Sequence, residues 1–264
     1  MQAARETLAG LRRSLAAIQA DRGAEGSPRF QFGLSEVDGA VGGGLPKAAL
    51  HEVFAAGSAD GPAASGFGLA MVLRACQPGQ TIVWVRQEMA GKEFGELYAP
   101  GLAEFGADPA SFLVVRVRDA ISVLRAGNEA LRCQALGAVV IEAWGEHPAF
   151  DLTATRRLAR RAARSGVGAF VIRLDAKPMP SAALSRWRVT SGSSTALATG
   201  APGTPVFEIE LLRHRAGFPL RRFSVEWDRE QSVFRRPSLS RALVSPAADR
   251  PFAPAQEGEW RRAG

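Results

Sequence analysis

The sequence predicts an α/β fold in which a mostly parallel central sheet is flanked by helices and ends in antiparallel strands. Between residues 48 and 174, short apolar, β-prone runs alternate with helical segments, the order typical of parallel βαβ units. After residue 184 apolar and polar side chains alternate with a period of two, which indicates antiparallel strands with one solvated face. With 264 residues, of which 46% are hydrophobic, the chain is long enough to bury a full core.

The charge of the chain favours an anionic partner. The formal net charge is +7, and arginine supplies most of it because Lys47, Lys92 and Lys177 are the only lysines. A coding bias that also raises Ala and Gly explains the same composition equally well. The three histidines and two cysteines show no ligand spacing, so we expect no metal site. No apolar run is long enough to span a bilayer, which predicts a cytoplasmic protein without membrane contact.

Residues 1–24 are predicted to form an amphipathic helix, followed by a linker at 25–31. The apolar side chains of this helix recur at three- and four-residue steps and therefore form one stripe. The stripe consists of Leu8, Leu11, Leu15 and Ile18. We expect it either to fold back on its own core or to dock on a second copy of the chain, which would give a homo-oligomer.

The stretch at 32–54 leads into the first central strand. The glycines at 42–44 predict a tight turn, and the apolar run at 48–54 predicts the strand. A glycine-rich loop follows, then a helix at 67–76 and a second buried strand at 81–85. Strand, loop, helix and strand in this order form a βαβ unit.

The same pattern then repeats along the chain. Two further helices, at 119–136 and 151–165, each begin with an aspartate that can cap the first turn, Asp119 and Asp151. The remaining strands are expected at 112–117, 138–143, 169–174, 206–213 and 223–227. Residues 237–264 lack any period and are expected to form a disordered tail.

The glycine-rich segment at 57–70 has the spacing of a phosphate-binding loop but lacks its chemistry. Gly61 and Gly66 are five residues apart, as in the Walker motif. Phe67 and Gly68 occupy the positions where that motif places a lysine and a hydroxyl for phosphate and Mg²⁺. We therefore expect that the segment keeps the backbone shape of a nucleotide-binding loop but has no catalytic residue, holds no cofactor and does not bind ATP.

Several segments between residues 30 and 228 resemble the ATPase core of RecA recombinases. The resemblance lies in the residues at 33–35 with Asp38, and in the turn at 42–46 before the strand at 51–54. It implies a RecA-like core at 32–228 with a degenerate P-loop.

Two acidic residues extend this resemblance. Glu88 matches the carboxylate that activates the attacking water in RecA proteins, and Glu142 matches their Mg²⁺-associated carboxylate. Without a phosphate to serve, however, Glu88 is more simply an exposed loop carboxylate. Glu142 is either a relic of such a site or a local hydrogen-bond acceptor.

Within that superfamily the chain is most similar to the ImuA family, through the segments at 97–102 and 144–146, the arginine-rich composition and the missing Walker lysine. The resemblance implies an SOS accessory protein of error-prone translesion DNA synthesis that associates with the nucleoid after DNA damage. Its implied partners are an ImuB-like relative of Y-family polymerases and a polymerase α subunit. Two alternatives stay open: an active RecA-like DNA-dependent ATPase, and a damage-induced cell-division inhibitor that acts by protein binding.

Three surfaces are candidate contacts. The helix at 151–165 carries arginines at three- and four-residue steps, which form either a face for single-stranded DNA phosphates or a merely solvated face. These arginines are Arg156, Arg157, Arg160, Arg161 and Arg164. Loops at 175–181 and 191–204 compete for the same role, with Lys177, Arg186 and Arg188 nearby. Trp260 is either an anchor for a partner or an incidental terminal tryptophan.

Overall fold

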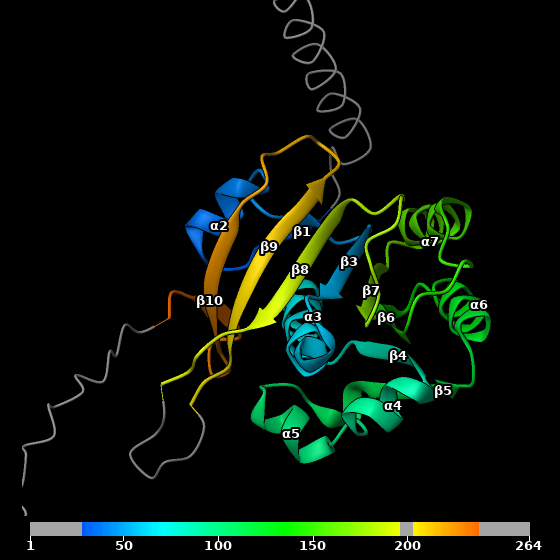
Figure 1. Cartoon of the computed structure of the whole chain (residues 1–264), viewed down its shortest axis with the longest axis horizontal. Helices are drawn as coiled ribbons and strands as arrows, with labels where there is room; N and C mark the ends of the chain where they lie inside the picture. The colour runs from blue at the N-terminus through cyan, green and yellow to red at the C-terminus, as the bar shows by residue number, and fades with distance from the viewer. Residues whose placement is uncertain (1–27, 196–202, 238–264) are drawn as a thin grey trace, which may run out of the picture.

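The computed structural model describes residues 28–195 and 203–237 (Figure 1). The predicted helix at 1–24 with its Leu/Ile stripe, most of the tail at 237–264 and Trp260 lie outside the described residues. Within the described ranges, no helix is long and apolar enough to cross a membrane.

A nine-stranded sheet forms the centre of the molecule, in the order β11-β10-β9-β8-β3-β7-β6-β4-β5 (Figure 1). The strands from β8 to β5 in this order pair in parallel, whereas β8, β9, β10 and β11 pair antiparallel. The predicted α/β architecture, mostly parallel with antiparallel strands at its C-terminal end, is confirmed. The strands are β3 (Leu50–Ala55), β4 (Thr81–Gln87), β5 (Phe112–Val117), β6 (Leu136–Trp144), β7 (Gly168–Leu174), β8 (Ser185–Ser191), β9 (Val206–His214), β10 (Arg222–Asp228) and β11 (Val233–Arg235).

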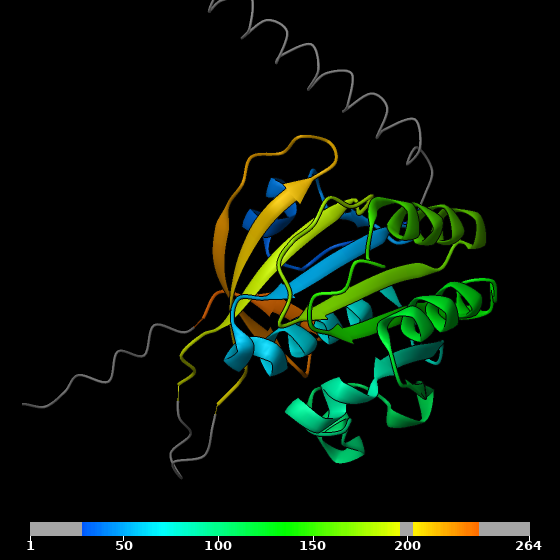
Figure 2. The same cartoon turned by 45° about the vertical axis from the view of Figure 1, so that its right-hand side comes forward.

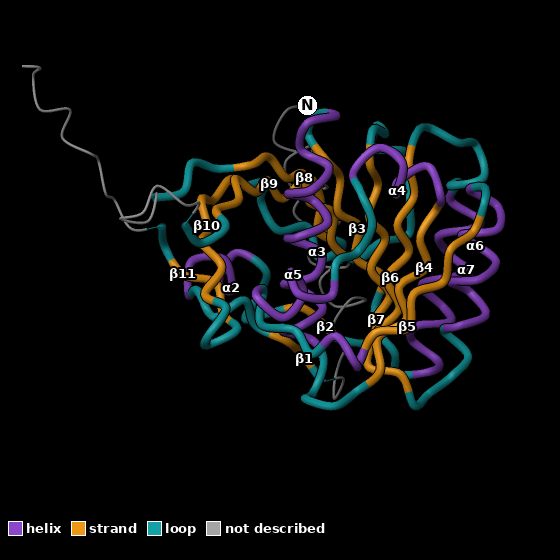
Figure 3. Tube along the Cα trace, turned by 90° about the horizontal axis from the view of Figure 1, so that it is seen from below, coloured by secondary structure: helices purple, strands orange, loops and turns teal. Residues whose placement is uncertain are grey.

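Helices cover the two faces of this sheet differently. Helix α3 (Gly61–Ala75) crosses one face, with α2 (Ser35–Ala40), α4 (Glu88–Phe94) and α5 (Ala99–Glu104) packed around the same core. Helices α6 (Ala120–Ala130) and α7 (Leu152–Ser165) pack side by side on the other face (Figures 2 and 3). Their buried side chains belong to one core with those of β6 and β7. The two helices therefore lie over the parallel half of the sheet.

The two cores differ in composition. The core under α3 is aromatic, with Phe32, Phe67, Trp187 and Phe234 all fully buried. The core under α6 and α7 is mainly aliphatic. Long apolar runs such as 138–143 are buried on both faces, as expected for central parallel strands.

Regular secondary structure begins nearer the N-terminus than the sequence predicts. Arg29–Phe30 forms strand β1, which pairs antiparallel with β2 (Leu45–Pro46). The prediction of a linker through residue 31 is therefore wrong at these two positions, because Phe30 is buried in the aromatic core. The turn at Gly42, Gly43 and Gly44 is confirmed, since all three have positive φ angles, which glycine adopts at little steric cost.

Both predicted aspartate caps are confirmed. Asp119 accepts a hydrogen bond from the Ser122 backbone N–H at 2.8 Å, and Asp151 accepts one from Ala154 N–H at 2.7 Å. Other boundaries differ from prediction. Helix α6 ends at Ala130 and not at residue 136, and the sheet continues past residue 228 into β11.

Candidate functional site

The glycine-rich segment after β3 is a helix and not a loop. A short 3₁₀ turn at Ser58–Asp60 connects β3 to α3, which begins at Gly61. Gly61 and Gly66 therefore lie inside the helix, and the expectation that a loop runs to residue 66 is wrong. Their N–H groups form no inward-facing cradle of the kind that a phosphate loop requires.

Close packing explains glycine at two positions of α3. A β-carbon at Gly61 would lie 2.5 Å from the Phe94 ring, and one at Gly68 would lie 2.7 Å from Cδ1 of Ile172 on β7. Both distances are far below ordinary van der Waals contact, so a larger residue would push the helix away from its neighbours. Glycine here allows the helix to approach the sheet and α4.

Phe67 does not lie where a phosphate chain would bind. Its side chain is fully buried, with ring centroids 5.5 Å from Phe234, 6.0 Å from Trp187 and 6.3 Å from Phe32. Because α3 begins at Gly61, residue 67 falls almost two turns into the helix, on the side facing the sheet. The expectation that residue 67 stands at the phosphate-contacting position of a Walker loop is corrected: this ring fills the aromatic core.

The N-terminus of α3 is surrounded by acidic side chains. Asp60, the residue before the helix, accepts hydrogen bonds from the Ser191 backbone N–H at 2.9 Å and from the Ser191 hydroxyl at 3.1 Å. Asp175 accepts one from the Ser58 hydroxyl at 3.1 Å. Helix N-termini attract anions, but two carboxylates at this end compete with an incoming phosphate and repel it.

Glu142 forms part of a closed polar network beneath α3. Its carboxylate is fully buried and accepts hydrogen bonds from the Ser65 hydroxyl at 2.7 Å and the Trp84 indole N–H at 2.9 Å. Arg86 Nε lies 2.6 Å from the Glu142 carboxylate, an ion pair in which the N–H is not aligned for a hydrogen bond. The other Arg86 nitrogens donate to the carbonyls of Gly95 and Ala90. Glu142 is thus a local hydrogen-bond acceptor whose oxygens are already engaged.

Glu88 is the first residue of α4 and its side chain is exposed. The structure places it in a helix, not in a loop as expected. A carboxylate in the first turn of a helix is favourable by itself, since it faces the positive end of the helix dipole. In the described part of the chain, no group of three or more His, Cys, Asp or Glu residues is arranged to hold a metal ion.

Three of the candidate DNA contacts are engaged in ion pairs. Arg186 is buried and pairs with Glu52 at 2.7 Å, while its Nη2 donates to the Met179 carbonyl. Arg188 pairs with Glu210 at 3.0 Å, and exposed Lys177 lies 4.0 Å from Glu146. Burial removes Arg186 from the residues able to reach a phosphate backbone, which corrects its selection from the sequence.

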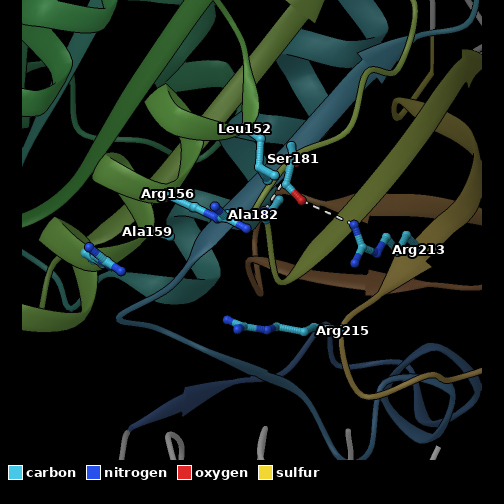
Figure 4. Close-up of a pocket in the computed structure, with 9 residues that line it drawn as sticks. Leu152, Arg156, Ala159, Ser181, Ala182, Arg213 and Arg215 are labelled. Carbon is cyan, nitrogen blue, oxygen red and sulfur yellow. Dashed lines mark hydrogen bonds between the residues drawn. The ribbon is translucent and has the colours of Figure 1, made fainter. Parts of the chain in front are cut away.

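Arginines of α7 lie on two different flanks of the helix. Arg157 lines a groove of about 400 Å³ between α6 and α7. Arg156 and Arg160 instead line a cavity of about 280 Å³ on the other flank of the helix, together with Arg213 and Arg215 at the end of β9 (Figure 4). Small and apolar side chains complete this arginine cavity, and none of its lining residues carries a carboxylate.

Comparison with known proteins identifies the family. No protein-family model matches the chain. The chain is 35% identical over 214 residues to the protein ImuA of Caulobacter vibrioides, strain NA1000, in an alignment that covers 73% of this chain and 81% of that protein. The chain belongs to the ImuA family. ImuA of a second Caulobacter vibrioides strain gives the same values.

In this ImuA-family chain, the arginine cavity combines residues that the sequence pattern found with residues that it missed. Periodicity along the helix at 151–165 selected Arg156 and Arg160. Arg213 and Arg215 are separated from them by more than 50 residues of sequence and become neighbours only through the position of β9. The only sequence signal that could have marked them is the alternation of arginines at 213 and 215.

Proposed function

We propose that this chain is a non-catalytic accessory protein of a damage-induced, error-prone translesion DNA synthesis system. Its proposed role is to assemble an ImuB-like relative of Y-family polymerases with a polymerase α subunit, in the cytoplasm and at the nucleoid. The observation that carries the proposal is the 35% identity to ImuA across 81% of that protein.

The geometry of α3 supports the absence of catalysis. The helical glycine-rich segment, the buried ring of Phe67 and the carboxylates of Asp60 and Asp175 leave no cation and no free hydroxyl where a RecA-like site would hold phosphate and Mg²⁺. We propose a RecA-like core whose former nucleotide site has been replaced by packing. A large electrostatic contribution to phosphoryl transfer would then be missing.

A titration of the purified full chain with a fluorescent ATP analogue in Mg²⁺ tests the non-catalytic part. We expect no saturable binding up to millimolar analogue. Micromolar binding that EDTA abolishes would refute this part and would favour an active ATPase.

Co-expression tests the assembly role. The tagged chain is expected to co-purify with an ImuB-like protein and a polymerase α subunit from the same genome. An unrelated protein with the same tag serves as the bait control. Recovery of a cell-division protein in place of the polymerase components would contradict the proposal.

Self-association is a separate part of the proposal and involves residues 1–24. Deleting these residues is expected to lower the mass measured by light scattering. An unchanged mass would contradict self-association through this segment.

A further inference from the structure

We infer that the arginine cavity binds a phosphate of a single-stranded DNA backbone, without reading the base sequence. The cavity is formed by Arg156 and Arg160 of α7 and by Arg213 and Arg215 at the end of β9. This inference goes beyond the proposed assembly role and can be tested without any partner protein.

The cavity concentrates positive charge from two elements that face each other. Figure 4 shows Arg156 extending from α7, and Arg213 and Arg215 extending from the β9 side, into the same space. All four arginines are exposed, and Arg156, Arg160 and Arg215 form no ion pair with another described residue. Their guanidinium groups are therefore available to an anion from solution.

The walls of the cavity are held by hydrogen bonds. The Thr155 hydroxyl, on the first turn of α7, accepts from the Ala182 backbone N–H at 3.1 Å, which ties the helix to the segment that enters β8. Arg213 donates to the Ser181 carbonyl at 3.2 Å, a contact that orients its guanidinium while its other N–H groups stay available (Figure 4). A preformed site of this kind loses little conformational entropy when it binds.

The nearest buried acid does not neutralise the cavity. Glu52 lies beneath the Ser181 wall, but its carboxylate already accepts from the Ser181 hydroxyl at 2.8 Å and pairs with Arg186 at 2.7 Å. Arg186 thus satisfies the charge of Glu52, and the four cavity arginines keep a net positive potential. An anion that enters meets no opposing carboxylate in the lining.

The size and chemistry of the cavity favour a polymer backbone over a free nucleotide. About 280 Å³ is at the small end of ligand pockets, and the lining has no aromatic ring on which a base could stack. A guanidinium fork matches phosphate oxygens in bidentate geometry. Because α7 carries a further exposed arginine, Arg164, one turn after Arg160, a polyanion can extend along this flank of the helix, whose turns repeat at about 5.4 Å.

A flexible single strand suits the recess better than a duplex. The cavity lies between a helix and a strand end, so a phosphate must enter a concave space. Single strands can bend to present one phosphate at a time, whereas a duplex presents its phosphates on a stiff convex surface. Sequence-neutral binding by an electropositive groove is a known mode of single-strand recognition.

The test is fluorescence anisotropy of a labelled oligothymidylate with the full chain, at several salt concentrations. The double variant Arg156→Ala/Arg215→Ala is expected to bind roughly tenfold more weakly and to lower the salt slope by about 0.7, the contribution of one phosphate contact to a single strand. The control Arg116→Ala/Arg132→Ala is matched in charge and exposure: it removes two arginines from β5 and from the turn after α6, whose side chains are 63% and 60% exposed and pair with Glu96 and Glu129. It is expected to keep the wild-type affinity, and Arg156→Lys/Arg215→Lys is expected to keep most of the salt slope.

Several results would overturn the inference. Equal losses in the cavity and control variants would indicate a general charge effect, and an unchanged affinity of the cavity variant would exclude the site. Equal binding of duplex DNA would contradict the single-strand assignment. Oligoglutamate of the same charge, bound with the same sensitivity to the variants, would point to an acidic protein segment in place of DNA. Inorganic phosphate bound at micromolar concentration without oligonucleotide binding would point to a small anion.

The cavity variant also separates this inference from the proposed function. It is expected to retain binding to the ImuB-like partner while it loses oligothymidylate. If the wild-type chain fails to bind that partner yet binds oligothymidylate through the cavity, the proposed function fails and the cavity assignment stands.

Discussion

Gly68 of α3 packs directly against Ile172 of β7, so closely that a β-carbon at position 68 would lie 2.7 Å from Cδ1 of Ile172. Both residues are buried in the core beneath α3. Glycine at this position is therefore a packing requirement. A residue that the spacing of the Walker motif places at the position of a Mg²⁺-binding hydroxyl instead sets the distance between helix and sheet.

We predict that Gly68→Ala lowers the free energy of unfolding by about 1–3 kcal/mol, the usual cost of overpacking a core. Alanine normally stabilises a helix relative to glycine by about 0.5–1 kcal/mol, so the expected sign is reversed. Gly66→Ala is the matched control, because its β-carbon would meet Phe207 at an ordinary 3.4 Å. Urea denaturation measures both; a stabilising Gly68→Ala would contradict the packing explanation.

The double variant Phe67→Lys/Gly68→Thr is predicted not to restore nucleotide binding. The variant introduces the lysine and the hydroxyl of the Walker motif, but the side chain at position 67 points into an aromatic core and not toward a phosphate. A buried, unpaired ammonium should strongly lower the melting temperature. Phe67→Leu, which keeps an apolar side chain, should cost much less. Binding of an ATP analogue by the double variant would show that the α3 N-terminus still forms a phosphate site.

The regular elements of the fold were predictable because their signals are local. The apolar runs that became β6 and β7 are buried on both faces, and the caps at Asp119 and Asp151 are bonds between neighbours in sequence. The start of α3 was not predictable in the same way. A glycine-rich segment reads as a loop, although Pro62 lies in the first turn of α3, where helices favour proline. The close approach of Gly61 to Phe94 and of Gly68 to Ile172 explains why glycine, a poor helix former, stands in this helix.

The candidate binding residues were also predictable only where the signal is local in the sequence. Periodicity selected the arginines of α7, but it could not show which of them face β9 and which face α6. It also could not show that Arg186 is paired with Glu52, because that contact joins residues 134 positions apart. A group of charged residues in the sequence can be assigned to a binding surface only when the burial and the ion pairs of those residues are known.

Glu142→Gln is predicted to destabilise the chain by about 3 kcal/mol, because it leaves the buried Arg86 with only the half-exposed carboxylate of Glu96, at 3.7 Å, as a counter-charge. Glu88→Gln, at an exposed helix start, is the control and should change stability by less than about 0.5 kcal/mol. Glu142→Gln combined with Arg86→Met should recover part of the loss, since no unpaired charge then remains. Chemical denaturation of the wild type, Glu142→Gln, Arg86→Met and the double variant measures this coupling, with Glu88→Gln beside them; a Glu142→Gln variant as stable as wild type would contradict the network.

The stability of the fold is predicted to fall as the pH drops below about 6.5, because His51 is buried as a neutral ring. Burial lowers the pKa of His51 to about 4, opposed by its hydrogen bond to the Pro46 carbonyl and assisted by the nearby His214. Since the unfolded chain takes up the proton near pH 6.5 and the folded chain only near pH 4, acid favours unfolding between these values. The expected loss from His51 alone is about 2 kcal/mol between neutral pH and pH 5.

A non-titrating variant isolates this contribution. The His51 ring contacts the Pro46 carbonyl at 3.0 Å and the Ser185 hydroxyl at 2.8 Å, and the carbonyl requires an N–H donor, so Nε2 carries the proton and Nδ1 accepts from Ser185. His51→Gln should be less stable at pH 7 because it loses part of this geometry, yet its stability should depend less on pH between 7 and 5. Burial also lowers the pKa of His214 to about 4, so a residual slope is expected in His51→Gln and should shrink further in the double variant with His214→Gln. Equal slopes in the wild-type and His51→Gln proteins would mean that His51 is not the group whose protonation weakens the fold.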